Sequence, residues 1–302
     1  MKILVTGGTT FVSKFTAAWF VRRGDEVYVL NRGTRKQIEG VRLIQADRHA
    51  LNGALRGHHF DAVLDICAYN ERDVNALLDG LDGFEDYILI SSSAVYPETN
   101  ARPFREEQTI GPNRIWGQYG LDKIAAERAL ERRCPRGYIL RPPYLYGPMQ
   151  NIYREPFVFD CALAGRPFYI PGDGTMGLQF FHVTDLCRVM EAILMRHPET
   201  HVFNVGNPET VDVNTFVAEC YEAVGCPLST IFVPKDAAPQ RSYFCFHDYD
   251  YQLDTTRQQA LLPKTVPLSQ GLRESRAWYE KHRDDVVRKP YMTYIDTQLK
   301  IS

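Results

Sequence analysis

The first 32 residues constrain the fold of this chain most strongly. An apolar, β-branched run at Lys2–Thr6 leads into Gly7 and Gly8, a helical pattern covers residues 11–23, and a second β-rich run covers Glu26–Leu30. Strand, glycine turn, helix and strand in this order form a dinucleotide-binding unit. Glycines let the backbone approach a pyrophosphate, and the helix N-terminus supplies free amides and a positive dipole end. We therefore expect the cofactor contacts of the turn to be Gly7, Thr9, Thr10, Phe11 and Val12.

The alternation of short β-rich runs and helical stretches continues to residue 148, which predicts an α/β fold with a parallel, doubly wound sheet. Beyond residue 148, prolines separate shorter elements. We expect residues 1–148, joined again by 182–206, to form the dinucleotide-binding domain. Residues 149–181 and 207–302 are expected to form a smaller mixed α/β lobe for the substrate, with the last dozen residues as a loosely ordered tail. The predicted strands are Lys2–Thr6, Glu26–Leu30, Arg42–Gln45, Ala62–Ile66, Tyr87–Ser91 and Gly137–Leu140.

A tyrosine and a lysine four residues apart, Tyr119 and Lys123, open a helical run after an apolar strand that ends in hydroxyls. This spacing places both side chains on one helix face, one turn apart. An ammonium beside a phenol favours the phenolate, so we expect Lys123 to lower the pKa of Tyr119. A serine among Ser91, Ser92 and Ser93, at the end of that strand, is expected to hold a substrate hydroxyl against that tyrosine.

Together these segments resemble the NAD-dependent epimerase/dehydratase family of the extended short-chain dehydrogenase/reductases, over roughly residues 1–210. Further markers in family order are Arg141-Pro-Pro-Tyr-Leu-Tyr-Gly-Pro148, Gly172-Asp-Gly174 and Phe203-Asn-Val-Gly206. The resemblance implies a Rossmann fold, with Ser92, Tyr119 and Lys123 as the catalytic residues. It also implies contacts between the cofactor and Asp47, Arg48, Cys67, Ala68, Tyr119, Lys123 and Pro142. The turn departs from the usual three glycines at Thr10 and Ser13, and in this it resembles an atypical branch that includes the chloroplast stem-loop-binding proteins.

The end of the second strand bears on the choice between NAD and NADP. An acidic residue at this point receives the adenosine ribose hydroxyls of NAD, but this chain has Asn31 followed by Arg32, with Arg35 and Lys36 nearby. A guanidinium can pair with the 2′-phosphate of NADP, which a carboxylate would repel. The sequence slightly favours NADP. Simple loop charge is the alternative interpretation of Arg35 and Lys36.

The residues after Ser92 bear on the reaction. Dehydratases of the family place Asp-Glu there to eliminate water, whereas this chain has Ser93-Ala94, which argues against a dehydratase. The expected function is hydride transfer at a secondary alcohol or ketone of a sugar, a sugar nucleotide or a related hydroxy compound. Epimerase and reductase both remain open.

The substrate-binding candidates are Ser93, Tyr144, Leu178 and Gln179. Tyr144 stands where epimerases of sugar nucleotides carry an asparagine, and Leu178 where they carry an arginine. An unpaired diphosphate is costly to bury, so these two residues predict weak binding of UDP-hexoses unless Arg154 or Arg166 replaces the lost cation. His182 is either a substrate ligand or a packed strand residue.

Bulk composition excludes several classes of protein. Basic and acidic residues number 35 and 37, for a net charge of −2, so no global positive field recruits nucleic acid or an anionic membrane. A nucleotide-sensing or RNA-binding protein on the same fold remains the alternative function. The seven cysteines contain no CxxC pair and the histidines no ligand spacing, which predicts reduced thiols, no metal and a cytoplasmic location. In relatives, helices corresponding to residues 74–81 and 122–133 often form a dimer interface, so we expect a homodimer.

Overall fold

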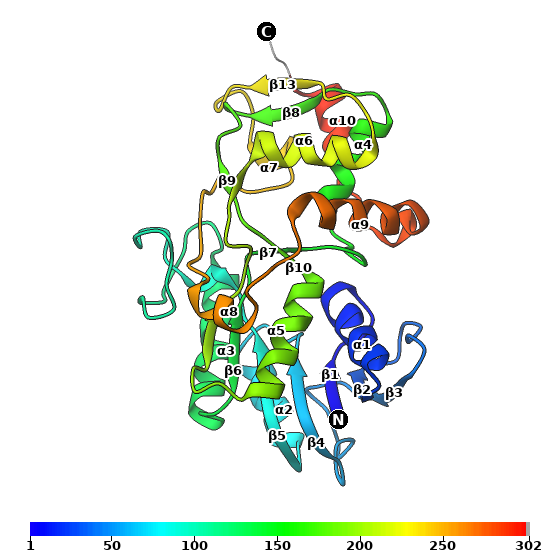
Figure 1. Ribbon diagram of the computed structural model, residues 1–302, viewed down its shortest axis with the longest axis vertical. Coiled ribbons are helices and arrows are strands. Elements are labelled where there is room, and N and C mark those ends of the chain that lie inside the picture. The colour runs from blue at the N-terminus through cyan, green and yellow to red at the C-terminus, as the bar shows by residue number, and fades with distance from the viewer. Residues whose placement is uncertain (300–302) are drawn as a thin grey trace.

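The computed structural model describes residues 1–299, and its larger body is built on one seven-stranded sheet (Figure 1). The strand order is β11-β6-β5-β4-β1-β2-β3, and every neighbouring pair is parallel. The order reverses between β1 and β4, which is the switch point at which doubly wound sheets bind ligands. The predicted fold class is therefore confirmed. The bounds of these strands are β1 Lys2–Thr6, β2 Glu26–Asn31, β3 Val41–Gln45, β4 His59–Asp65, β5 Gly83–Ile90, β6 Tyr138–Arg141 and β11 Val202–Asn204.

Helices cover both faces of this sheet. On one face α1 (Phe11–Arg23) packs beside α5 (Val183–Arg196), and on the other α2 (Glu71–Gly80) packs beside α3 (Gln118–Arg133). Gly24 ends α1 in the left-handed conformation, with φ 95°, and its amide bonds to the last turn, which is why the chain can turn directly into β2. The carboxyl halves of the central strands β1, β4, β5 and β6 are buried on both faces, as their apolar runs predict, whereas the edge strand β3 is largely exposed.

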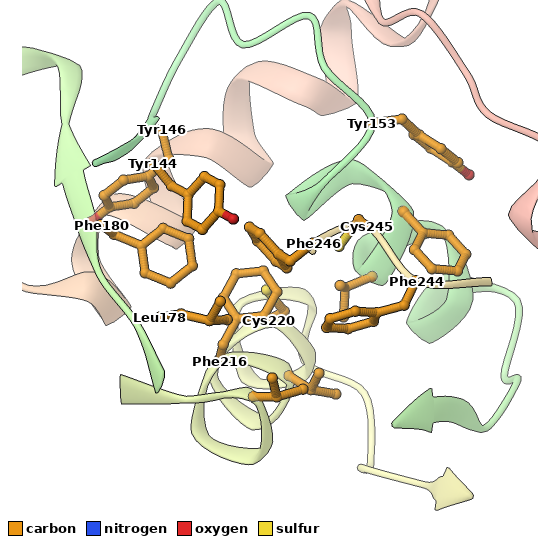
Figure 2. Close-up of a cluster of buried hydrophobic side chains, with 14 of the residues drawn as sticks. Tyr144, Tyr146, Tyr153, Leu178, Phe180, Phe216, Cys220, Phe244, Cys245 and Phe246 are labelled. Atoms are coloured by element: carbon orange, nitrogen blue, oxygen red, sulfur yellow. The ribbon is translucent and has the colours of Figure 1, made fainter. Parts of the chain in front are cut away.

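The smaller body lies above the carboxyl ends of the strands (Figure 1). Its two-stranded sheet pairs β8 with β13 in parallel, and α4, α6 and α9 pack on one another beside it. Its core is rich in aromatic side chains, some of which Figure 2 shows. The bounds are β8 Phe168–Pro171, β13 Thr230–Val233, α4 Glu155–Leu163, α6 Val213–Val224, α7 Gln240–Tyr243, α9 Leu268–Lys281 and α10 Tyr291–Thr297.

Short elements join the two bodies. After β6 the chain forms β7, crosses the small body through α4 and β8, and returns through β9 and β10 into α5. In this region β10 pairs with β7 in parallel and β12 pairs with β9 antiparallel. The bounds are β7 Tyr144–Tyr146, β9 Gly177–Leu178, β10 Phe180–His182, β12 Val211–Asp212 and α8 Thr256–Leu261, with 3₁₀ helices at Ser93–Val95 and Arg283–Asp285.

The expectation of a loose tail was wrong for residues 291–299. Helix α10 buries Tyr291 and Ile295 in the core of the small body, because its apolar side chains recur at helical spacing. Residues 300–302 of that prediction lie outside the described residues. Among the helices of residues 1–299, none has the length and apolar character to cross a membrane.

Candidate functional site

A cavity of about 640 Å³ lies between the two bodies, at the carboxyl ends of the sheet strands. The large body contributes the turn after β1 and the segments after β4, β5 and β6, together with the first turn of α3. The small body contributes residues 151–154 and 241–251. This is the position at which the switch point of the sheet predicts a ligand.

The turn after β1 forms the cradle expected for a pyrophosphate. Gly7 has φ 90°, and a Cβ on it would lie 2.6 Å from the Cys67 sulfur. A Cβ on Gly8 would lie 2.6 Å from Val29 Cγ1, so both positions require glycine. Thr10 precedes α1 without capping it through its side chain, and the helix N-terminus faces the cavity. A dinucleotide therefore fits here, and all five predicted turn residues line the cavity: Gly7, Thr9, Thr10, Phe11 and Val12.

The end of β2 supports this turn from below. The Asn31 amide donates to the Gly7 carbonyl at 2.6 Å, so Asn31 fixes the turn and does not itself line the cavity. Arg32 is exposed at the start of the following loop. Arg35 reaches furthest toward the cofactor turn, because its guanidinium donates to Thr10 Oγ1 at 3.0 Å. Thr10, which stands where the family usually has a glycine, is thus hydrogen-bonded to the guanidinium of Arg35.

Three residues that the resemblance assigned to the cofactor lie outside the cavity lining. Asp47 accepts a hydrogen bond from the amide of His49, and Arg48 forms an ion pair with the fully buried Asp65. The carbonyl of Ala68 accepts a hydrogen bond from Lys123. Cys67 and Pro142 do line the cavity. Cys67 is largely buried, and burial raises the pKa of its thiol.

The structure brings Tyr119 and Ser92 together at the centre of the cavity. Tyr119 lies in the first turn of α3, with 40% of its surface exposed. Desolvation raises the pKa of Tyr119, and a side-chain hydrogen bond with Ser92 opposes this shift. Ser92 Oγ accepts the amide of Ala94 at 3.2 Å, which leaves its hydroxyl proton free to donate. The pair can hold one oxygen atom of a ligand between a donor and an acid.

Lys123 lies one turn further along α3 but does not lower the pKa of Tyr119 as expected. Its ammonium is buried and donates to the carbonyls of Ala68 and Ile90, at 2.7 and 2.9 Å. It lies 6.0 Å from the centroid of the Tyr119 ring, and the pKa of Tyr119 is raised mainly by desolvation. Burial also lowers the pKa of Lys123 itself, to about 8. The four-residue spacing correctly placed Tyr119 and Lys123 on one helix face. The ammonium of Lys123, however, is hydrogen-bonded to the two backbone carbonyls.

At the substrate end, the structure separates the four candidates into two pairs. Ser93 and Tyr144 line the cavity. Leu178 is fully buried in the aromatic core of the small body, where Figure 2 shows it near Phe216. Gln179 is also fully buried, and its amide is bonded to the backbone of Leu253 on both sides. The position at which the resemblance implies an arginine therefore belongs to the core of this chain.

His182 packs as a strand residue. It has no exposed surface, its ring lies 5.1 Å from that of Tyr146, and it is absent from the lining of the cavity. Burial lowers the pKa of His182 to about 4, so the ring is neutral at ordinary pH.

Two arginines of the small body line the cavity, and sequence patterns alone did not place them. Arg154 is 8% exposed; its Nε has no hydrogen-bond partner and lies 3.9 Å from Glu155. Arg241, on α7, joins it from a segment far along the chain. Arg166, the other candidate of the sequence, is instead paired with Asp296 outside the cavity. Together with Lys123, the lining within residues 1–299 carries three cations and no carboxylate, so it favours an anionic ligand.

Aromatic side chains make up much of the remaining wall, and spacing in sequence gave no signal for them. They come from three separate segments: Tyr69 after β4, Trp116 before α3, and a run near residue 250. The aromatic lining members of that run are Phe246, His247 and Tyr251, with Cys245 beside them. In the described part of the chain, no three His, Cys, Asp or Glu side chains are arranged to hold a metal ion.

Comparison with known proteins identifies the family. The chain is 28% identical to the chloroplast stem-loop binding protein of 41 kDa b of Arabidopsis thaliana over 256 residues, which are 78% of this chain and 67% of that protein. It is 26% identical to a dTDP-glucose 4,6-dehydratase of Streptomyces griseus, covering 86% and 80% of the two chains. The solved structure of a UDP-glucose 4-epimerase of Thermotoga maritima has the same fold, with a TM-score of 0.76 at 21% identity and coverage of 93% and 99%. Residues 3–206 match the model of one protein family, described as the NAD dependent epimerase/dehydratase family. The chain belongs to the NAD-dependent epimerase/dehydratase family.

Proposed function

We propose that this protein is an NAD(P)-dependent epimerase or oxidoreductase that transfers hydride at a secondary alcohol or ketone of an anionic, hydroxylated ring compound such as a sugar nucleotide. The observation that carries the proposal is one cavity that contains the dinucleotide cradle, the Ser92–Tyr119 pair and a cationic far end. The names of the relatives, which include a UDP-glucose 4-epimerase of Corynebacterium glutamicum, support the same class of substrate.

The chain's own residues account for the proton and the orientation. Ser92 donates to the reacting oxygen and holds it against the Tyr119 hydroxyl, which gives or takes the proton. Lys123 lies one helical turn after Tyr119, and its ammonium donates to two backbone carbonyls. The family resemblance implies that Lys123 contacts the nicotinamide ribose. A nicotinamide cofactor, when bound, would supply the hydride acceptor and donor.

The lining also supports the exclusion of dehydratase chemistry. Elimination of water from a ketone intermediate needs a second acid and base near the reacting carbon. Within residues 1–299 the cavity is lined by no Asp or Glu, and Ser93 and Ala94 follow Ser92 in their place. We therefore propose an epimerase or a reductase.

Arg154 and Arg241 change the expected affinity for sugar nucleotides. Weak binding of UDP-hexoses was predicted on the ground that Leu178 replaces an arginine, but Arg154 and Arg241 now supply cations to the same cavity. Arg154 is the stronger candidate, because a buried guanidinium with an unpartnered nitrogen gains most from an anion.

Replacing Arg154 by methionine is expected to weaken the binding of UDP by roughly 10- to 150-fold, the usual value of a charge-assisted hydrogen bond. Calorimetric titration of the protein with UDP measures it. The matched control is Arg166→Met, which removes the same charge from an exposed ion pair outside the cavity and should leave the affinity for UDP unchanged. Equal losses in both variants would mean that general charge, and not Arg154, attracts the nucleotide.

For the cofactor, we propose a preference for NADP, supported by Arg32 and Arg35 beside the turn. The parent protein should bind NADPH more tightly than NADH, and Arg32→Ala should weaken NADPH binding by roughly 10- to 150-fold while sparing NADH. Arg35→Ala is expected to act in the same direction. Fluorescence titration of the reduced cofactors measures both affinities, with Lys36→Ala as the control for loop charge. Tighter binding of NADH by the parent protein would contradict the preference.

The activity itself is tested by incubating the protein with cofactor and a panel of UDP- and dTDP-hexoses. Proton NMR of the sugar would reveal an epimer, and the absorbance of the reduced nicotinamide would reveal net oxidation or reduction. A panel without any change in sugar or cofactor would count against hydride transfer on this class of compound.

RNA binding is the second candidate function, and the Arabidopsis thaliana relative named for stem-loop binding is the observation that favours it. The net charge of −2 and the pI near 6.5 oppose it, since affinity for nucleic acid rests mainly on positive charge. Filter binding of a stem-loop RNA across a salt titration decides the matter. Salt-dependent affinity in the nanomolar range would favour the RNA function, and its absence removes this alternative.

A cytoplasmic location and a homodimer through α2 and α3 remain proposals. The outer surfaces of these two helices carry ion pairs within one chain, Glu71 with Arg132 and Asp79 with Arg133. Light scattering at several protein concentrations would determine the oligomeric state.

A further inference from the structure

Trp116 forms the part of the cavity wall that lies next to the catalytic tyrosine. It precedes α3 by one residue of loop, and its ring centroid is 6.5 Å from that of Tyr119 and 5.1 Å from that of His247. It also contacts Tyr144 and Tyr249. All four pairs are edge-on, with interplanar angles between 60° and 77°, so among the described residues none stacks on the indole.

The position of Trp116 is fixed from behind by Asn113. Asn113 is 3% exposed, and its side-chain oxygen accepts the amides of Ile115 and Trp116, at 2.8 and 3.2 Å. Its side-chain nitrogen donates to the Tyr96 carbonyl at 2.8 Å and to the Tyr249 hydroxyl at 3.1 Å. One buried amide thus ties together the loop after Ser92, the approach to Tyr119 and the small-body segment near residue 250. Such a fully bonded group is rigid, and a rigid support is what a contact residue for a substrate requires.

The wall between Tyr119 and the arginines has a definite chemical character. The Trp116 ring lies 6.5 Å from that of Tyr119 and 6.3 Å from that of Tyr144, and the Arg154 guanidinium lies over the Tyr144 ring at 5.3 Å. A ligand whose anionic group is bound at Arg154 and whose reacting oxygen lies at Tyr119 therefore passes along Trp116. A flat indole offers apolar surface and little polarity, which suits the C–H face of a saturated ring. Hydroxyl groups at the ring edge then remain directed toward Ser92 and Ser93.

We propose that Trp116, held by Asn113, binds the ring that carries the reacting carbon and thereby determines specificity for pyranose substrates. The proposal rests on the proposed function, since it takes the substrate to be an anionic ring compound. Trp116 contributes to binding of the sugar part of the ligand and not of its phosphate part. Asn113 is a positioning residue that acts through Trp116.

The test compares UDP-glucose with UDP, which lacks the hexose, by calorimetry on the protein saturated with cofactor. Trp116→Leu should weaken UDP-glucose binding by roughly 3- to 10-fold, the value of an aromatic contact, and change UDP binding by less than about twofold. Trp116→Phe, which retains a ring, should recover most of the loss. Asn113→Ala should reproduce the selective loss in milder form. The matched control is Trp278→Leu on α9, whose ring stacks on His282 away from the cavity.

The outcomes separate this proposal from the one on which it rests. If the parent protein binds both ligands and Trp116→Leu loses affinity for both equally, or for neither, the role of Trp116 is overturned while the substrate class stands. If Phe does not restore the affinity that Leu loses, the ring contact is likewise overturned. If the parent protein binds neither ligand, the sugar-nucleotide class is wrong and the role of Trp116 falls with it.

Discussion

Replacing Tyr119 by phenylalanine is expected to reduce turnover by ~10²–10⁴-fold while the affinity for the cofactor changes little, because the substitution removes only the oxygen that exchanges the proton. In the proposed function, cofactor binding rests on the turn after β1 and on Lys123, which the substitution leaves intact. Steady-state kinetics on the substrate found in the panel, together with a cofactor titration, measures both quantities.

The control for this variant is Tyr169→Phe, which removes the same hydroxyl from a tyrosine of β8 outside the cavity and should leave turnover unchanged. Because burial raises the pKa of Tyr119, the phenol stays protonated at neutral pH and is ready to donate to a ketone. Oxidation of an alcohol needs the phenolate instead, so its rate should rise with pH through the neutral and mildly alkaline range. A Tyr119→Phe variant that keeps more than about a tenth of the parent activity would mean that another group carries the proton.

Replacing Glu127 by alanine is expected to cost about 3–5 kcal/mol of the free energy of unfolding, because it leaves the charge of Arg141 buried and unpaired. The two side chains are 0% and 4% exposed, and Arg141 donates to both Glu127 oxygens at 3.0 and 2.7 Å. Ser91 also donates to Glu127, and Arg141 donates to the Tyr96 hydroxyl at 2.8 Å, so the pair anchors the end of β5 directly before Ser92. Urea denaturation followed by circular dichroism measures the loss.

Two further variants show whether the ion pair is the cause. Glu131→Ala, one turn later on the outer surface of α3, should change stability by less than about 0.5 kcal/mol. The double variant Glu127→Leu with Arg141→Met removes both charges and should be more stable than Glu127→Ala alone, because no charge is left unpaired. A double variant less stable than the single one would show that the hydrogen bonds to Ser91 and Tyr96 matter more than the charges.

The sequence predicted best the features that are local along the chain. The strand, glycine turn and helix of residues 2–23 were recognisable because each lies within one turn or strand of the next. The spacing of Tyr119 and Lys123 placed them correctly on one helix face, because helical periodicity fixes that relation. The orientation of the Lys123 ammonium was not predictable, since it depends on carbonyls of two other segments, at Ala68 and Ile90.

The residues at the substrate end of the cavity could not be predicted from local sequence patterns. Arg154 and Arg241 both line the cavity although they are 87 positions apart in the sequence, and neither belongs to a recognisable spacing. Trp116 lies close to Tyr119 in sequence, but its partners His247 and Tyr249 come from a segment of the small body much further along the chain. Leu178 gave the opposite error, because the resemblance implied a binding position and the side chain belongs to the core. Only the packing of distant segments decides such roles.

The place of β11 has a consequence for how the chain is made. This strand pairs Val202, Phe203 and Asn204 with β6, yet it is synthesised only after the first segment of the small body, with α4 and β8, and after α5. Until then β6 presents an open, apolar edge that another chain can join. At synthesis rates of roughly 5–20 residues per second, the interval between residues 148 and 204 is on the order of 3–11 s. The two bodies are therefore not modules that can be cut apart and recombined at residue 148, because the nascent large body needs a strand that arrives late, and chaperones have their clearest opportunity to act in that interval.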